Sequence, residues 1–278
     1  MVTRKRVHRG RSKRRTKLQL RGRRRRGGGA EPTINFVTYG NEGYKGAKER
    51  IKKQAEEMNI FNGNIRIYSP EDLSEEFKAA VGQTLQEPRG GGYWVWKPYI
   101  INDMLNQLNE DDILVYTDAG CTLQPAGVPR LKEYINMISK DSGKCVLAMR
   151  LEFPENNWTT SAIFEHFGIP PENDRAESNQ VLTGASIYRK CKGSMALVSA
   201  WLKTAMERPE LFTNVFNEEA KVKRPAFYEN RHDQSVFSVL VKSPPHNEHV
   251  VIIDEEIEGR SKTIEPSKIP IYATRKSS

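Results

Sequence analysis

The sequence has few cysteines and no glycine-rich phosphate motif, and each shortage excludes a class of protein. Its three cysteines are an odd number, and no Cys-x-x-Cys pair occurs among them. This pattern argues against a disulfide framework and against a cysteine zinc site, and it fits a reducing compartment. No G-x-G-x-x-G or G-K-[ST] element is present, so a classical dinucleotide or P-loop site is unsupported.

Long hydrophobic runs are missing as well. No apolar stretch approaches the length that spans a membrane, and the N-terminus lacks the apolar core of a secretory signal. These absences predict a soluble, intracellular protein without a membrane span, with the cytoplasm as its default location.

Acidic residues are absent from residues 1–29, which contain 14 of the chain's 44 Lys and Arg residues. This leader has almost nothing to bury, so we expect a disordered tail that ends in a Gly27–Gly29 hinge. It fits nucleic-acid or other polyanion binding, nuclear targeting, or a merely solvated tail; sparse apolar residues make a transit peptide the weakest interpretation. Residues 30–278 hold the other 30 basic and all 35 acidic residues, enough chain for one mildly acidic α/β domain.

Short apolar strands alternate with helical patterns along this body. Strands are predicted at 34–40, 64–70, 113–117, 145–149, 181–188 and 250–253. Helices are predicted at 44–60 and 72–81, after Pro98, and at 195–205 and 233–241. The alternation predicts an α/β fold with a mostly parallel, doubly wound sheet flanked by helices.

The strand predicted at 113–117 runs directly into Asp118. Its sequence, Ile-Leu-Val-Tyr-Thr, is typical of a strand covered on both faces. Ligands of open α/β sheets bind just beyond the carboxyl ends of such strands, which makes Asp118 a candidate functional carboxylate. Taken alone, Asp followed by Gly indicates an ordinary turn at least as well.

Three motifs in a fixed order carry a resemblance to a known family. They are Trp-x-x-Lys-Pro at 94–98, Asp-Ala-Gly at 118–120 and His-Asp-Gln-Ser at 232–235. With them the sequence resembles nucleotide-sugar glycosyltransferases of the GT-A fold, especially bacterial capsule-type and large-DNA-virus enzymes, from about Ile34 to Ile253. The resemblance implies a GT-A-like domain and a hexosyl- or pentosyltransferase. Such an enzyme moves a sugar from a nucleotide-sugar donor to a hydroxyl of a saccharide or glycoprotein acceptor.

The resemblance also implies where the donor and a metal would bind. In this family a divalent cation, Mn²⁺ or Mg²⁺, is bound by an Asp-x-Asp motif and neutralises the donor diphosphate. Asp118 matches the first Asp, but Gly120 stands in the second position, and His232 is the candidate for the missing ligand. The nucleoside would lie against the end of the first strand, at Thr38, Tyr39 and Gly40.

Direct cationic contacts to the diphosphate are the alternative to a metal. Lys97 and Arg89 are the candidates, with Gly90–Gly92 allowing the backbone to approach closely. A solvated lysine and a plain glycine loop are the simpler interpretations. Trp94 and Trp96 are more typical of packing than of a stacking platform.

The motif at 232–235 supplies the second catalytic candidate, Asp233, with Gln234 at the donor. A carboxylate can stabilise charge near the anomeric carbon or accept the proton of the acceptor hydroxyl, although an Asp that merely caps a helix also fits. Gly184 is expected close to the donor sugar, and its alternative is a tight strand–helix contact.

Two other functions compete with the glycosyltransferase. A nucleic-acid-binding protein is suggested by the basic tail, but the acidic body has no basic stripe. A sugar nucleotidyltransferase would share the α/β sheet, but it should carry a glycine-rich triphosphate loop near the first strand. The glycines of residues 40–46 are scattered and lack a basic partner of that kind.

Overall fold

The computed structural model describes residues 31–170, 173–259 and 264–277, so the predicted basic tail at 1–29 lies outside the described residues. The described residues from Pro32 onward belong to one compact unit. Its strands are β1 Ile34–Tyr39, β2 Ile65–Tyr68, β3 Ile113–Thr117, β4 Thr122–Leu123, β5 Val146–Pro154, β6 Asn179–Val181, β7 Ala185–Arg189, β8 Val250–Asp254 and β9 Ile271–Tyr272. Its α-helices are α1 Lys45–Glu57, α2 Glu75–Val81, α3 Gly90–Tyr93, α4 Lys97–Gln107, α5 Val128–Met137, α6 Glu155–Trp158, α7 Ser161–His166, α8 Asp174–Glu177, α9 Lys192–Glu207, α10 Asn217–Lys223 and α11 Asp233–Val241.

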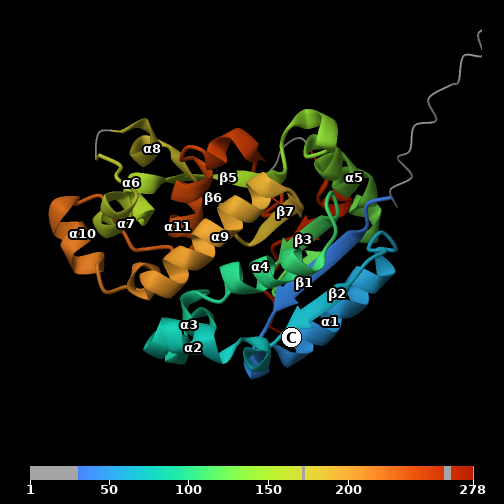
Figure 1. Ribbon diagram of the computed structural model, residues 1–278, viewed down its shortest axis with the longest axis horizontal. Coiled ribbons are helices and arrows are strands. Elements are labelled where there is room, and N and C mark those ends of the chain that lie inside the picture. The colour runs from blue at the N-terminus through green and yellow to red at the C-terminus, as the bar shows by residue number, and fades with distance from the viewer. Residues whose placement is uncertain (1–30, 171–172, 260–263, 278) are drawn as a thin grey trace, which may run out of the picture. The chain divides into compact units, whose positions relative to one another are not determined.

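The main sheet has seven strands in the order β2-β1-β3-β7-β5-β6, with β8 also paired to β5 (Figure 1). β1 is parallel to β2 and β3, and β5 is parallel to β8. β7 runs antiparallel to both β3 and β5, and β6 runs antiparallel to β5. Five strands therefore point the same way, and the predicted mostly parallel α/β sheet is confirmed. The antiparallel β7 at its centre was not foreseen.

Helices cover both faces of this sheet, as the alternating pattern predicted. One hydrophobic cluster joins the sheet to α2, α4, α9 and α11, and Figure 1 shows α4 and α9 in front of the strands. A second cluster joins the opposite face to α1, α5 and the small β4–β9 sheet. β3 lies between the two clusters, and all five of its residues are buried. The apolar run at 113–117 is thus explained by burial on both faces.

The predicted strand at 181–188 is wrong in one respect, because the structure divides it into β6 and β7. The two strands are separated by Leu182–Gly184. β6, before this break, pairs with β5, whereas β7, after it, pairs with both β3 and β5. The turn is fastened to the end of β3, since the Asp118 amide donates a hydrogen bond of 2.9 Å to the Gly184 carbonyl. A continuous strand would close the space where this turn now lies beside Asp118.

None of the helices in the described residues is both long and apolar enough to cross a membrane.

Candidate active site

A pocket of about 490 Å³ opens where β1 and β3 end, and it gathers residues from widely separated parts of the chain. Most of the residues predicted from the sequence to form the site line it. They are Tyr39, Gly40, Arg89, Lys97, Asp118, Gly120, Gly184, His232, Asp233 and Gln234. Thr38 is the exception: it is fully buried, and its hydroxyl donates a 2.6 Å hydrogen bond to the Thr117 carbonyl, so it ties β1 to β3 behind the pocket.

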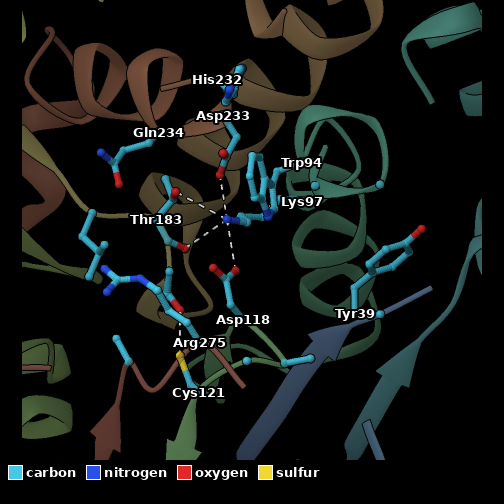
Figure 2. Close-up of a pocket in the computed structure, with 18 of the residues that line it drawn as sticks. Tyr39, Trp94, Lys97, Asp118, Cys121, Thr183, His232, Asp233, Gln234 and Arg275 are labelled. Carbon is cyan, nitrogen blue, oxygen red and sulfur yellow. Dashed lines mark hydrogen bonds and ion pairs between the residues drawn. The ribbon is translucent and has the colours of Figure 1, made fainter. Parts of the chain in front are cut away.

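A buried lysine lies at the centre of the pocket (Figure 2). Lys97 is the first residue of α4, and its ammonium lies 2.7 Å from Asp233 Oδ2 and 3.2 Å from Asp118 Oδ1. The same nitrogen is 3.4 Å from both the hydroxyl and the carbonyl oxygen of Thr183, in the turn between β6 and β7. Four oxygens from three segments therefore surround one cation. This arrangement favours Lys97 as a positioning residue rather than the phosphate contact predicted from the sequence.

The electrostatics of this cluster follow from its burial. Burial alone would lower the pKa of Lys97, but the carboxylates of Asp118 and Asp233 outweigh it and hold the pKa above the usual lysine value. Burial raises the pKa of Asp233, and the Lys97 ammonium opposes part of that rise. Lys97 is therefore protonated at neutral pH, whereas Asp233 holds a proton more readily than an ordinary aspartate.

Asp118 is oriented by its own strand as well as by Lys97. The hydroxyl of Tyr116, two residues earlier in the chain, donates a 2.6 Å hydrogen bond to Asp118 Oδ1. Burial, with the nearby Asp118 charge, raises the pKa of Tyr116 far above its usual value, so the phenol remains a donor. The side chain of Asp118 is 37% exposed, against 5% for Asp233. Asp118 is thus the more accessible of the two carboxylates.

The histidine before Asp233 is neutral and has one defined tautomer. His232 Nδ1 lies 2.8 Å from the Phe212 carbonyl, and because a carbonyl only accepts, Nδ1 carries the proton. Its ring stacks on Tyr93 at 4.5 Å, and burial lowers its pKa to about 4. Nε2 is buried and has no hydrogen-bond partner within the part of the chain that the structure describes. The backbone of His232 has a φ of 57°, an uncommon conformation for a side chain of this size.

The predicted metal ligands, Asp118 and His232, do not form a cluster with other ligands. Across residues 31–170, 173–259 and 264–277 there is no group of three or more His, Cys, Asp or Glu side chains suited to a metal ion. Figure 2 shows Lys97 and Asp233 between the two predicted ligands. These residues do not fit a metal bound by the protein alone. A cation bound here would take most of its ligands from the donor diphosphate and water, with Asp118 as its contact to the chain.

The glycine turn at the pocket rim is built around the two tryptophans. Gly90–Gly92 all have positive φ, and a Cβ on Gly90 would come within 2.4 Å of the Trp94 ring. Trp96 packs face to face with Tyr39 at 3.9 Å, as the packing interpretation predicted. Arg89 is paired with an acidic residue, because both of its terminal nitrogens contact the Glu229 carboxylate, at 3.1 and 3.2 Å.

Two further predicted residues hold the site in place. The Gln234 side-chain amide donates a 2.7 Å hydrogen bond to Gln180 Oε1 and is largely buried, so it links α11 to β6. A Cβ on Gly184 would lie 3.4 Å from Asp118 Oδ2, which accounts for a small residue there. Sequence reasoning missed Tyr116 and Thr183, whose contacts to Asp118 and Lys97 depend on the folded chain.

Three similar solved structures resemble this chain remotely. No family model and no curated protein matches the chain. A glycosyltransferase involved in glycosylation of the major capsid of PBCV-1 is 11% identical with a TM-score of 0.42, over 80% of this chain and 82% of that one. Mouse xyloside xylosyltransferase 1 is 12% identical with a TM-score of 0.43, over 80% and 85%. Core-mannan synthase A from Aspergillus fumigatus, in an Mn/GDP form, is 11% identical with a TM-score of 0.41, over 81% and 74%. These likenesses are too distant to assign a family or an activity to this chain.

Proposed function

We propose that this protein is a glycosyltransferase that moves a sugar from a nucleotide-sugar donor to a hydroxyl of a saccharide or glycoprotein acceptor. One observation carries the proposal: Asp118 and Asp233, 115 positions apart in the sequence, are held on one pocket by the same buried ammonium. Glycosyl transfer needs paired groups of this kind, one at the donor and one at the acceptor hydroxyl.

The reaction assigns a distinct task to each carboxylate. The acceptor oxygen forms a bond to the anomeric carbon, and the bond from that carbon to the diphosphate oxygen breaks. The electron pair of the broken bond stays on the diphosphate, and the acceptor proton passes to Asp233. Its raised pKa suits it to accept that proton, because a base works best when its pKa approaches the working pH. Asp118, the more exposed carboxylate, lies on the donor side.

Lys97 contributes by fixing the geometry rather than by meeting substrate. Its ammonium is already surrounded by oxygens of Asp118, Asp233 and Thr183, and its side chain is only 2% exposed. It therefore holds both carboxylates at a set separation, and catalysis depends steeply on such positioning.

Positive charge must still reach the leaving diphosphate. A divalent metal would supply it as a Lewis acid, with Asp118 as its protein ligand and the donor oxygens completing its shell. The nucleoside would lie against Tyr39 and Gly40 at the end of β1, both of which line the pocket.

The test is a donor screen with the full-length protein. UDP-, GDP- and CMP-sugars are incubated with the enzyme in Mn²⁺ and, separately, in excess EDTA, and the release of free nucleotide is measured. We expect at least one donor to be hydrolysed, and Asp118→Asn to lose that activity. If no sugar nucleotide is bound or turned over in either condition, the glycosyltransferase proposal is wrong.

A further inference from the structure

The C-terminal segment of the described chain lies against the Asp118–Gly120 turn. β9 pairs with β4, which follows this turn directly. The Gly120 carbonyl then accepts two hydrogen bonds, one of 3.0 Å from the Lys276 amide and one of 2.9 Å from the Thr274 hydroxyl. The segment is therefore fastened to the place where the resemblance to GT-A enzymes calls for a second carboxylate.

Gly120 packs directly against this segment. A Cβ on Gly120 would lie 3.4 Å from Arg275 Cα and 3.5 Å from the Lys276 carbonyl oxygen, which are contact distances, so the backbone of the segment borders this position. In the folded chain an arginine thus lies next to the position of the absent acid.

Arg275 is presented to the pocket by an unusual backbone. Its φ is 54°, a backbone conformation that residues other than glycine rarely adopt and that recurs at functional sites. The residue lines the pocket, and Figure 2 shows it on the side of Asp118 and Cys121, opposite His232 and Asp233. Its side chain is 73% exposed, so it can change position without unpacking the core.

Three other cations of the pocket are engaged differently. Lys97 is buried among protein oxygens, and Arg89 uses both terminal nitrogens on Glu229. The Arg231 guanidinium lies over the rings of Phe153 and Trp158. Arg275 contacts Glu258 through a single nitrogen, Nη2. A guanidinium offers five donors in a planar fork that matches the oxygens of a phosphate group.

We infer that Arg275 binds the diphosphate of the donor. Beside Asp118 it supplies positive charge, which in an enzyme with a second carboxylate would come from a metal bound by that carboxylate. This inference rests on the proposed function. Glu258 holds the guanidinium at the rim while the pocket is empty, and the diphosphate competes with that carboxylate for it.

The experiment measures nucleotide affinity by calorimetry on the full-length protein in EDTA, with UDP, GDP and inorganic pyrophosphate as probes. Uridine and guanosine, which lack phosphate, serve as ligand controls. Arg275→Gln should weaken nucleoside diphosphate binding about tenfold or more, because it removes hydrogen bonds to a charged group, and nucleoside binding should not change. Lys276→Gln removes a neighbouring charge that does not line the pocket, and it should bind as the wild type does.

A second variant separates binding from folding. If Arg275 binds the diphosphate, Glu258→Gln removes its competitor and should tighten UDP or GDP binding. If the ion pair is only structural, Arg275→Gln and Glu258→Gln should weaken binding alike, which would overturn the inference. Unchanged diphosphate affinity in Arg275→Gln would overturn it too and leave the proposed function intact. If the wild type binds nucleoside diphosphates only when Mn²⁺ replaces EDTA, the inference is wrong and the proposed function stands, whereas failure to bind them in either condition would refute both.

Discussion

Replacing Lys97 by methionine tests the centre of the site, because the change removes the charge and keeps much of the side-chain volume. Asp233 would then be a carboxylate with a 5% exposed side chain and no cation at 2.7 Å. At an effective dielectric constant of about 20, the attraction across that distance is about 6 kcal/mol, and desolvation of both groups cancels part of it. Breaking a buried pair on one side costs about 3–5 kcal/mol.

Thermal unfolding followed by circular dichroism measures this loss. For a domain of this size each kcal/mol lowers the melting temperature by about 2–4 °C, so a decrease of roughly 6–20 °C is expected. Lys203→Met is the matched control, since Lys203 is 70% exposed and its partner Glu207 is 3.8 Å away. That variant should melt close to the wild type.

The loss of stability in Lys97→Met should also depend on pH, and the pKa of Asp233 decides whether it grows or shrinks as pH rises. Without Lys97 the folded-state pKa of Asp233 rises further above its unfolded value of about 3.9. A carboxyl group with a raised folded pKa stabilises the fold at low pH and loses that contribution as pH rises through the folded pKa. The deficit of Lys97→Met should therefore be small near pH 4 and grow as pH rises, and Asp233→Asn in the same chain should recover part of it. A Lys97→Met protein that melts like the wild type from pH 5 to 8 would refute the buried-pair account.

Three further changes test the roles of single groups. Asp118→Asn should abolish transfer and leave the melting temperature nearly unchanged, since Asp118 is partly exposed; full activity would remove Asp118 from the donor site. Asp233 follows the N-cap His232 and does not itself cap α11, and Asp233→Asn keeps the shape of its side chain, so turnover falling roughly 10²-fold with nucleotide affinity retained would identify the base. Intact turnover would show that Asp233 has only a structural role. His232→Ala should leave Mn²⁺ affinity close to that of the wild type, because Lys97 and Asp233 lie between His232 and Asp118; a joint loss of Mn²⁺ binding and activity would show instead that Nε2 is a metal ligand.

The parts of this fold that the sequence predicted are those decided by local burial. Residues 113–117 form a strand with the predicted bounds, because a run of apolar side chains suits only a strand covered on both faces. The helix after His232 was also placed correctly from Val236, Phe237, Leu240 and Val241, although every residue of α11 is buried and not one side alone. Asp118 and Asp233 could be nominated because each directly adjoins such an element.

Thr183 and Arg275 were missed because their partners are far away in the chain. Residues 181–188 have the composition of one strand, and nothing in them shows that Thr183 will meet a lysine that starts a helix 86 positions earlier. Arg275 has no motif around it, and its place in the pocket follows from pairing between β4 and β9. Periodicity reports which face of an element is buried, but it does not report which distant residue lies opposite.

The same contacts hold the fold and the site together, which limits how the site can vary. Lys97 joins the start of α4, the end of β3, the β6–β7 turn and the start of α11 through its contacts with Asp118, Thr183 and Asp233. A change at Lys97 or Asp233, which are both buried, alters both the stability of the core and the spacing of the carboxylates. Arg275 differs, because it is exposed and its backbone, rather than its side chain, packs on Gly120. Substitutions at Arg275 can therefore change ligand affinity without unfolding the sheet, so it is the position where binding and stability separate most cleanly.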